Sequence, residues 1–466
     1  MPVPRLVVHI VLDDLGAEQV GRYGRNAASP GLAAQPFLDS LWDSGVRLTN
    51  YFAEAFCSPA RACHMTGRHT EDTGTGDIIE SDNDTPLLLD QLLLPEVLKI
   101  WFGTEIQTAC IGKWHLGNAS VGGKRSPLTA GFDYFYGSER NILDFYEDNL
   151  SCQGQTYPAH GRFIPEVLTE ATTEWIRRFA AQRTKKGYLY VPFHLPHNPY
   201  WRPPSTLYNT ATWTLPGVQP APDVTYATSL PYFKAYIEAM DTLMARIWAS
   251  VPSSLKNETL LLVSSDNGTE STLLPFESYA PPLSAFNYLA THGKRSYFDP
   301  GVRVPAYAYS TNTGLVTAPG RSVTGLVQSL DWYSTTLDAF GVPWQEIVAA
   351  RGPRFGVSAA KRSKSIWPNL IANTATTNRT HAICGIFEPN GYNRGLSPGR
   401  RMITDGQFKF IFPTSATYLA KPSLYDIVDK PMENQAVFEP VGGSPQRVAL
   451  QVAWDAFYAS LPPVPS

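Results

Sequence analysis

The chain lacks the features that mark several classes of protein. It has no internal repeat, and no apolar run in it approaches the roughly 20 residues that a membrane-spanning helix needs. We therefore expect no membrane span. The net charge is only −3 and the chain has no long basic run, so we do not expect nucleic acid as a partner either. No signal peptide is visible, because the apolar run Leu6–Leu12 ends without a small-residue cleavage site. The sequence as written therefore predicts a cytoplasmic protein, or a periplasmic or secreted one if a native leader is missing.

Cysteine is scarce, with five residues at spacings that match no common metal site. They are Cys57, Cys63, Cys110, Cys152 and Cys384. If Cys57 has a function, four remain, and nothing in the sequence decides whether those four form disulfides. Cys63 falls roughly on the opposite face of a helix that begins at Cys57, so we expect it to be a thiol of the core.

The composition is that of a folded chain with many loops. Of 466 residues, 43% are hydrophobic and 17% charged, whereas glycine and proline are plentiful at 35 and 39. A core of substantial size is therefore expected and global disorder is not. Because the chain exceeds the usual size of a single core, we expect one large domain and a smaller one.

Two short apolar runs end abruptly in acidic or amide residues. The runs are 5–12 and 259–265, and their length and continuity are typical of strands in a parallel sheet that is covered on both faces. The residues that follow these two strands directly are Asp13, Asp14, Asp266 and Asn267. Helical patterns at 165–182 and 230–251 lie between the strands, so we expect an α/β fold with ligands bound beyond the carboxyl ends of its strands.

Two further predicted strands also lead into reactive side chains. Strand 106–111 leads into Gly-Lys-Trp-His-Leu-Gly, and if that segment stays extended, Lys113 and His115 point the same way. Strand 187–193 leads into a segment that contains His197. Each motif alone is compatible with a turn, a solvated loop or a packed histidine. Because several chemically matched clusters occur at predicted strand ends, we expect them to form one site.

The stretch from Cys57 to Arg68 predicts a helix that begins at a reactive residue. Pro59 suits the first turn, where the backbone N–H has no partner. Cys57 would then lie at the helix N-terminus, where free amides and the dipole favour anions and lower the pKa of a thiol. Arg61 lies one turn further along the same face, so its guanidinium can share the site with residue 57.

The residues at the strand ends also indicate a metal site. Their carboxylate and amide oxygens are hard ligands, which select Ca²⁺ or Mg²⁺ over zinc. These residues need not fill a calcium shell, which leaves positions for residue 57 and for a substrate oxygen. Three aspartates, a divalent ion and the cations Arg61, Lys113 and Lys294 leave the site with a net positive charge. Such a site is expected to bind a negatively charged ester and to stabilise charge in its transition state.

The motifs occur in an order that is found in one known family. The stretches already described, and others that follow them, match its segments at 11–16, 57–68, 112–117, 131–133, 136–137, 196–199, 266–268, 293–294, 301–305 and 424–426. With these motifs the chain resembles the type I sulfatases, within the alkaline phosphatase superfamily. Two positions of the signature differ, since Ala60 replaces a common Ser and His64 replaces the usual Leu.

The resemblance implies a modified nucleophile and a calcium ion. A separate formylglycine-generating enzyme would oxidise Cys57 to formylglycine (3-oxoalanine), whose hydrated aldehyde attacks sulfur and forms a covalent sulfo-enzyme. The second hydroxyl of the hydrate would then expel sulfate, which an unmodified Cys or Ser could not do. Ca²⁺, preferred over Mg²⁺, would be bound by Asp13, Asp14, Cys57, Asp266 and Asn267.

The same resemblance implies roles for the cations and histidines. Arg61 would stabilise the deprotonated hydroxyl of the nucleophile, and Lys113 would bind sulfate oxygens. His197 and Lys294 would position the sulfate and help protonate the leaving oxygen, and His115 would help remove the proton of the second hydroxyl. The expected partners are a small-molecule or saccharide sulfate ester and the maturation enzyme.

The resemblance also implies the architecture. We expect a large mixed, mostly parallel sheet sandwiched by helices, as in alkaline phosphatase, with a smaller antiparallel sheet beside it. The catalytic α/β domain is placed at 1–374 and a C-terminal α+β subdomain at 375–466. Local patterns add the following elements: a helix at 331–339, a run-out toward the second domain at 353–377, short strands at 382–387, 401–404 and 408–412, and a closing helix at 448–459.

Two alternatives remain open at this point. A phosphonate or phosphate ester hydrolase of the same superfamily would use the same fold, although Asn267 favours sulfate over the His that is common there. A pseudoenzyme or anion-binding protein would carry a Cys57 that is never oxidised. The sequence does not choose between aryl and carbohydrate substrates, for which 140–160 and 200–202 are expected to form pocket walls. His194 and His292 are expected to support the site rather than to react.

Overall fold

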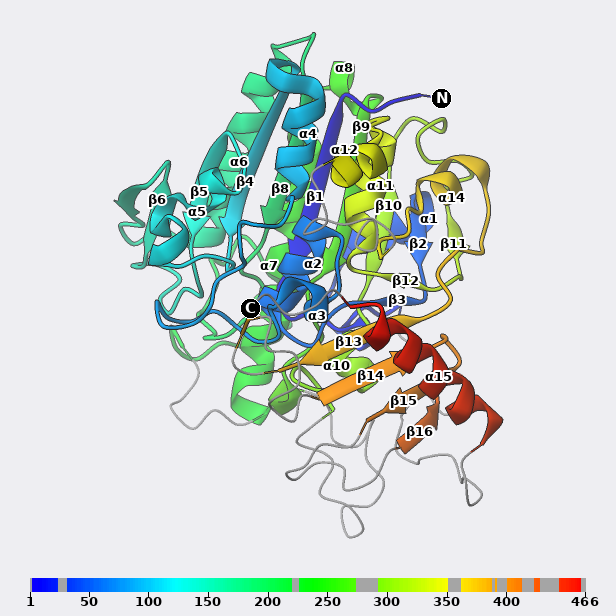
Figure 1. Ribbon diagram of the computed structural model, residues 1–466. Coiled ribbons are helices and arrows are strands. Elements are labelled where there is room, and N and C mark those ends of the chain that lie inside the picture. Colours follow the sequence, from blue (N-terminus) through cyan, green and yellow to red (C-terminus); the bar gives the residue numbers. More distant parts are fainter. Residues whose placement is uncertain are drawn as a thin grey trace.

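The protein is built around one large sheet, whose strands run between helices in Figure 1. This computed structural model describes residues 2–23, 32–219, 226–273, 292–350, 362–387, 390–391, 400–412, 423–427 and 444–461. The ten strands, in spatial order, are β11 (Arg321–Val323), β2 (Val46–Leu48), β10 (Ala306–Tyr309), β9 (Thr259–Ser265), β1 (Leu6–Leu12), β8 (Lys186–Pro192), β4 (Ile106–Lys113), β5 (Tyr134–Ser138), β6 (Asn149–Cys152) and β7 (Gln155–Pro158). The five strands from β9 to β5 are parallel, and antiparallel pairs flank them on both sides.

The four apolar runs expected to be strands are confirmed as β1, β4, β8 and β9, and they lie side by side in the centre of the sheet. Every residue of β1 is buried, because its side chains alternate between two cores. Leu6, Val8 and Ile10 belong to one core, and Val7 and Val11 belong to the other. A strand covered on both faces needs no polar face, which explains why β1 is apolar at every position except His9.

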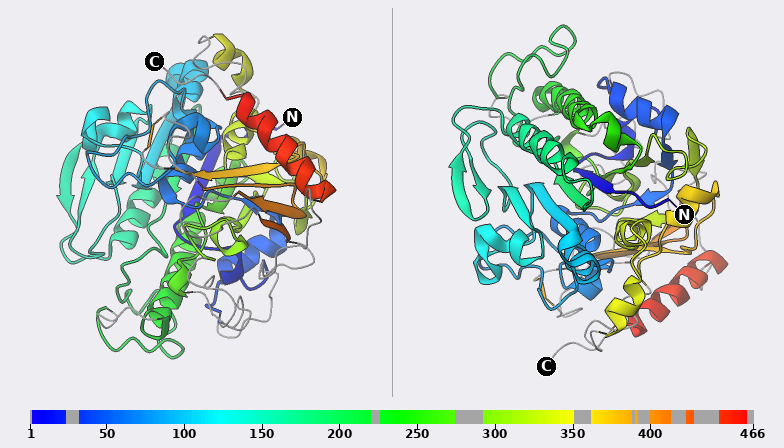
Figure 2. Two further views of the ribbon diagram at one scale, coloured as in Figure 1. Left: turned by 60° about the horizontal axis from the view of Figure 1, so that its bottom comes forward. Right: turned by 90° about the horizontal axis from the view of Figure 1, so that it is seen from above.

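Helices cover both faces of the sheet, as the turned views in Figure 2 show. One core is closed by α1 (Pro36–Ser44), α6 (Ile164–Ala180) and α7 (Tyr226–Ser250). The other is closed by α2 (Cys57–Thr66), α4 (Leu94–Phe102), α11 (Asp331–Ala339), α12 (Trp344–Ala350) and α14 (Trp367–Ala372). The helices predicted at 165–182, 230–251 and 331–339 are thus confirmed as α6, α7 and α11. None of the helices in the described ranges is long and apolar enough to cross a membrane.

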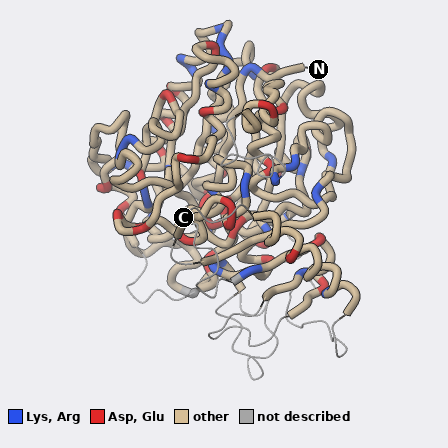
Figure 3. The backbone as a smooth tube through the Cα atoms, viewed as in Figure 1, with Lys and Arg blue, Asp and Glu red and all other residues tan. Residues whose placement is uncertain are grey.

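Short elements complete the main body. The short helices are α3 (Thr70–Thr73), α5 (Ser126–Thr129), α8 (Ser253–Lys256) and α10 (Asp299–Val302). The 3₁₀ turns are η1 (Ala17–Gln19), η2 (Gly103–Glu105), η3 (Ala119–Val121), η4 (Gly123–Arg125) and η5 (Ser271–Leu273). Strands β3 (Tyr51–Phe52) and β12 (Val327–Gln328) form a two-stranded parallel sheet, and β3 lies just before α2 in the chain. Acidic and basic residues are interspersed along the described chain, as Figure 3 shows.

A second, four-stranded antiparallel sheet lies below the main one in Figure 1. Its strands are β13 (Ala382–Ile386), β14 (Arg400–Thr404), β15 (Phe408–Ile411) and β16 (Ser423–Asp426). The closing helix α15 (Pro445–Ala459) packs Leu450, Trp454 and Phe457 on one face of this sheet. These elements confirm the predicted strands and the predicted helix, whereas the domain boundary at 374/375 stays a prediction.

The stretch 353–377 contains more structure than a run-out. Residues 351–361 lie outside the described residues, but α14 follows them and buries Trp367 and Leu370 in the core under the main sheet. The expectation of a plain run-out is therefore wrong for 367–372, because a six-residue helix with two large apolar side chains still has a face to bury.

A buried carboxyl group joins α2 to the small sheet. Glu54 is fully buried, and its Oε1 accepts hydrogen bonds from Cys63 Sγ at 3.6 Å and from Gln328 Nε2 at 3.2 Å. Gln328 in turn pairs with the backbone of Ile383 on β13 through both its Nε2 and its Oε1. Burial, reinforced by the charge of Glu71, raises the pKa of Glu54 to about 8. Glu54 is therefore protonated at neutral pH.

Replacing Glu54 by Gln is expected to stabilise the protein increasingly as the pH rises. The pKa of Glu54 is higher in the folded than in the unfolded protein, so the folded protein keeps a proton that the unfolded chain releases. The free energy of unfolding of the wild type therefore falls as the pH rises from the unfolded-state pKa to about 8. The difference in unfolding free energy between Glu54→Gln and wild type should grow by on the order of 2–4 kcal/mol from pH 5 to pH 8.5. Urea unfolding at both pH values measures it. The exposed Glu346→Gln should show no such trend, and an equal trend in that control would refute the assignment.

Candidate active site

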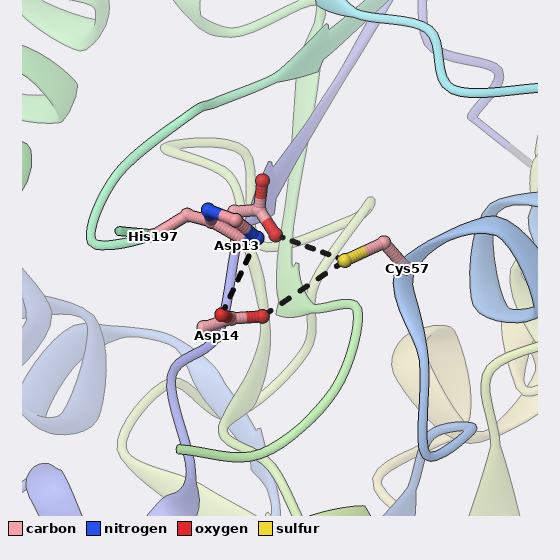
Figure 4. Close-up of side chains that lie close together, drawn as sticks. All are labelled: Asp13, Asp14, Cys57 and His197. Carbon is pink, nitrogen blue, oxygen red and sulfur yellow. Dashed lines mark hydrogen bonds and ion pairs between the residues drawn. The ribbon is translucent and has the colours of Figure 1, made fainter. Parts of the chain in front are cut away.

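The residues predicted to form a site meet at the carboxyl ends of the central strands. Asp13 and Asp14 follow β1, Asp266 and Asn267 follow β9, and Lys113 is the last residue of β4. Cys57 begins α2, whose first turn faces the end of β1 (Figure 4). All of the predicted residues are buried: Asp13, Asp14, Cys57, Arg61, Lys113, His115, His197, Asp266, Asn267 and Lys294.

The turn after β1 is held by backbone donors. Asp13 N–H bonds to the carbonyl of Leu195 at 3.0 Å, and Asp14 N–H bonds to Asp266 Oδ1 at 3.3 Å. Asp14 has a φ of 69°, in the left-handed region that few non-glycine residues adopt. The next two N–H groups bond to the hydroxyls of Ser265 and Thr269, both at 3.0 Å. The sequence analysis missed these two supports, although their positions beside Asp266 were a usable signal.

Cys57 lies at the N-terminus of α2, as its spacing to Pro59 predicted. Its Sγ lies 3.4 Å from Asp13 Oδ1 and 3.9 Å from Asp14 Oδ1, so the thiol points at both carboxylates (Figure 4). The expectation of a lowered thiol pKa is wrong. Burial and then the negative charge of Asp13 raise the pKa of Cys57, and together they outweigh the favourable helix terminus.

The guanidinium of Arg61 contacts the carboxylates of Asp266 and Asp13. Its Nε and Nη2 donate to Asp266 Oδ2 at 3.0 and 2.8 Å, and Nη2 lies 3.5 Å from Asp13 Oδ2. Nη1 donates to the carbonyl of Lys113, which ties α2 to the end of β4. The guanidinium has no exposed surface, so it compensates the buried charge of Asp266 and contributes to that of Asp13. Burial, followed by the charge of Asp13, nevertheless raises the pKa of Asp266 to about 7.

Each of the three carboxylates has a cation of its own. Lys113 Nζ lies 2.6 Å from Asp13 Oδ2, and Lys294 Nζ lies 2.8 Å from both oxygens of Asp14. Burial opposes the charge of Asp13, but Lys113 and the other nearby cations hold its pKa well below its ordinary value. For Asp14, burial prevails and raises the pKa. The cations thus compensate the acids one for one.

The two histidines occupy different settings. Strand β4 ends at Lys113 and His115 has a φ of 60°, so the extended segment on which their shared direction depended is not present. The N–H of His115 bonds to the carbonyl of Glu139 at 2.9 Å, and its ring is fully buried. His197 donates from Nδ1 to the carbonyl of Asn198, which leaves Nε2 with a lone pair 3.7 Å from Asp14 Oδ2. Burial and nearby lysines lower the pKa of both rings.

The arrangement suits a cation. Ligand atoms of Asp13, Asp14, Cys57 and His197 all lie within 4.8 Å of one another (Figure 4). Asn267 Nδ2 donates to Asp14 Oδ1 at 2.7 Å, while its buried Oδ1 has no hydrogen-bond partner among the described residues. A buried oxygen that has no hydrogen-bond partner and lies beside two carboxylates is what we expect of a metal ligand. His197 was expected to be catalytic only, and the structure brings its Nε2 into this group.

Two glycines let the strand ends approach each other next to Lys113. A Cβ on Gly112 would lie 1.9 Å from the carbonyl oxygen of Pro192, and one on Gly137 would lie 1.8 Å from that of Gly112. No side chain fits at either position. The ends of β4, β5 and β8 are therefore close because the sequence places glycine there.

The two expected pocket walls contact each other. The Tyr146 and Trp201 rings have centroids 5.9 Å apart, and Tyr146 O–H donates to the carbonyl of Arg202 at 2.7 Å. Trp201 Nε1 donates to the carbonyl of Leu143, whose side chain is 73% exposed. These segments form one aromatic surface.

The comparison with known families agrees with this geometry. A sequence model described as Sulfatase matches residues 5–342. The chain belongs to the sulfatase family. The matched residues include Asp13 and Asp14, Asp266 and Asn267, the Cys57 helix and the loops that carry the lysines and histidines. The sulfatases are part of the alkaline phosphatase superfamily, as the motifs predicted.

Several arylsulfatases are similar in sequence. Mouse arylsulfatase J is 25% identical over 350 residues, which cover 71% of this chain and 52% of that protein. Rat arylsulfatase G is 27% identical over 371 residues, which cover 73% of this chain and 65% of that protein. This sulfatase chain thus spans between about half and two thirds of the length of these two relatives.

Solved sulfatase structures share the fold. The PsFucS1 sulfatase from Pseudoalteromonas sp. superposes with a TM-score of 0.72 at 22% identity, over 99% of this chain and 91% of that one. BT4656 in complex with its substrate D-glucosamine-2-N,6-O-disulfate gives 0.71 at 17% identity, over 99% of this chain and 98% of that one. The fold class predicted from the sequence is confirmed, including the smaller antiparallel sheet.

Proposed function

We propose that this chain is a sulfuric ester hydrolase, similar to the arylsulfatases, that cleaves a sulfate monoester with a formylglycine made from Cys57. The observation that carries the proposal is the position of Cys57. Its Sγ points from the start of α2 at the Asp13 and Asp14 carboxylates, in a buried site with Arg61 and two lysines. A plain cysteine in that position has a raised thiol pKa and is a poor nucleophile, whereas a hydrated aldehyde would present hydroxyls there.

The metal ligands proposed are those expected from the motifs. Asp13, Asp14, residue 57, Asp266 and Asn267 would bind Ca²⁺, in preference to Mg²⁺, because oxygen donors dominate once the thiol is replaced. The ion would offset the charge of the carboxylates and allow an anionic ester to approach. His197 Nε2 borders the same space and would face the substrate.

The first half of the reaction would transfer the sulfuryl group to residue 57. Arg61 would hold the deprotonated hydroxyl of residue 57, which attacks sulfur as the bond from sulfur to the leaving oxygen breaks. Lys294 would deliver a proton to that oxygen. His197 would help position the sulfate, and it would share in the proton transfer once Nε2 has taken up a proton. Lys113 uses one N–H on Asp13, so two donors remain for sulfate oxygens.

The second half would regenerate the aldehyde. His115, neutral because burial lowers its pKa, would accept the proton of the second hydroxyl on residue 57. The electron pair of that O–H bond then forms the C=O bond while the C–O bond to sulfate breaks. Sulfate leaves and the nucleophile is ready for hydration.

Peptide mass spectrometry on residue 57 tests the proposal, with protein produced together with a formylglycine-generating enzyme. The expected product has lost one sulfur and two hydrogens and gained one oxygen. The matured protein should then release the phenol from an aryl sulfate, or sulfate from a sulfated saccharide, faster than it cleaves an aryl phosphate diester. Faster phosphate diester cleavage would identify a phosphoester hydrolase, and an unmodified Cys57 under these conditions would identify an unmatured pseudoenzyme.

A further inference from the structure

His194 takes no part in the proposed steps, yet it is buried at the end of β8 beside the residues that do. Its ring is 2% exposed, and Nε2 lies 2.6 Å from the hydroxyl oxygen of Ser138, the last residue of β5. Its Nδ1 has no hydrogen-bond partner among the described residues. When only one ring nitrogen of a buried histidine is hydrogen-bonded, the role of its partner decides which nitrogen carries the proton.

The hydrogen-bond inventory of Ser138 fixes that tautomer. A hydroxyl has one proton, and Ser138 O–H donates it to the carbonyl of Arg140 at 2.6 Å. Ser138 Oγ must therefore accept from His194, so the ring proton is on Nε2 and Nδ1 has a lone pair. Burial and the nearby Lys113 ammonium keep the ring neutral by lowering its pKa.

The bond joins the two segments that carry the proposed catalytic groups. On one side, the carbonyl of Ser138 accepts from Trp114 N–H at 2.9 Å, and the adjacent carbonyl accepts from His115 N–H. On the other side, the carbonyl of His194 accepts from His197 N–H at 3.1 Å. The carbonyl of Leu195, the next residue, accepts a hydrogen bond from Asp13 N–H at 3.0 Å. One side-chain hydrogen bond thus spans from the Lys113–His115 segment to the loop of His197.

We propose that His194 is a positioning residue whose Nε2–H bond to Ser138 sets the spacing between the Lys113–His115 segment and His197. The inference rests on the proposed function for its catalytic consequence. At Gly112 and Gly137 the backbones of β4, β5 and β8 approach each other without side chains of their own, and the His194–Ser138 bond adds a side-chain link between β5 and the loop after β8. Partners of this kind are known to affect activity without touching substrate.

Two substitutions of His194 give a matched test. The amide nitrogen of Gln can occupy the place of Nε2, so His194→Gln retains a donor to Ser138, whereas the shorter Asn does not reach. On an aryl sulfate, His194→Asn and Ser138→Ala should each lower kcat by about 10–100-fold with little change in KM, and His194→Gln should stay within about threefold of wild type. The double variant Ser138→Ala/His194→Asn should be no slower than either single variant, because all three lack the same bond.

Two results would overturn the proposal. One is equal loss in His194→Gln and His194→Asn at unchanged thermal midpoints, which would mean that ring volume and not the bond matters. The other is additive loss in the double variant, which would mean that Ser138 and His194 act separately.

A measurement without turnover separates this inference from the proposed function. Nitrogen-15 NMR of histidine-labelled protein, with the His194 signal assigned from its absence in His194→Gln, should show the neutral Nε2–H tautomer at pH 7. A Nδ1–H or doubly protonated ring would refute the bond even in an active enzyme. If the matured wild type hydrolyses no sulfate ester but the Nε2–H tautomer is found, the proposed function fails while the structural assignment holds.

Discussion

Cys57→Ala is expected to lower the turnover of an aryl sulfate by on the order of 10⁴-fold or more, because it removes the attacking atom. The side chain is buried, and its Sγ contacts only Asp13 and Asp14 among the hydrogen-bond partners described, so the fold should survive the change. Initial rates on matured protein, with circular dichroism as a check on folding, measure the effect. Turnover near that of wild type would remove residue 57 from the mechanism.

The control for this prediction lies on the same helix. Cys63 is also buried, but it contacts Glu54 and not the carboxylates of the site. Cys63→Ala should retain activity within a few-fold. A more informative variant is Cys57→Ser, whose single hydroxyl could attack sulfur once but has no second hydroxyl to expel sulfate. It should release at most one equivalent of the phenol, and the peptide should retain the added mass of one sulfo group (SO3).

Arg61→Met is expected to lower activity by about 10³-fold and to cost about 3–5 kcal/mol of stability. The substitution preserves much of the side-chain length, while it leaves Asp266 without the cation that binds it at 2.8 Å and leaves Asp13 with Lys113 only. Neither carboxylate has exposed surface, so water cannot replace the guanidinium. Urea unfolding and initial rates measure the two effects.

Two controls isolate the cause. Arg61→Lys keeps the charge but loses the paired donors from Nε and Nη2, so both effects should be intermediate. Arg178 pairs with Glu174 on the surface of α6, where its side chain is 73% exposed, and Arg178→Met should change stability by no more than about 0.5 kcal/mol. Equal destabilisation by Arg61→Met and Arg178→Met would show that burial of the Arg61 pair has no special weight.

The features predicted well from the sequence are those with a local pattern. Mostly apolar runs identified the central strands because burial on both faces leaves few polar positions, and Pro59 indicated the start of α2. The meeting of Asp13 with Asp266 followed from the rule that the carboxyl ends of parallel strands share an edge of the sheet. Each of these inferences needed only neighbouring residues or a general rule of topology.

The features that were missed depend on pairing between distant residues. Arg61 and Asp266 are 205 residues apart, and no periodicity reports that their side chains meet. The raised pKa of Cys57 depends on complete burial and on Asp13, whereas the helix terminus alone suggested the opposite. The left-handed backbone of Asp14 and His115 has only a weak sequence signal, because Asp and His are enriched in that region and yet most of them lie elsewhere.

The small sheet has a consequence for how this protein can be divided. Its inner face packs Ala382, Cys384 and Met402 against Phe52 and Ala55, which lie just ahead of Cys57 in the chain. Ending the chain near residue 374 would therefore expose the apolar side chains of Phe52 and Ala55, in the segment that leads to Cys57. The family match at 5–342 also stops short of the small sheet, so a fragment that ends at residue 342 would expose the same apolar surface. Fusion or domain exchange at either position meets this obstacle.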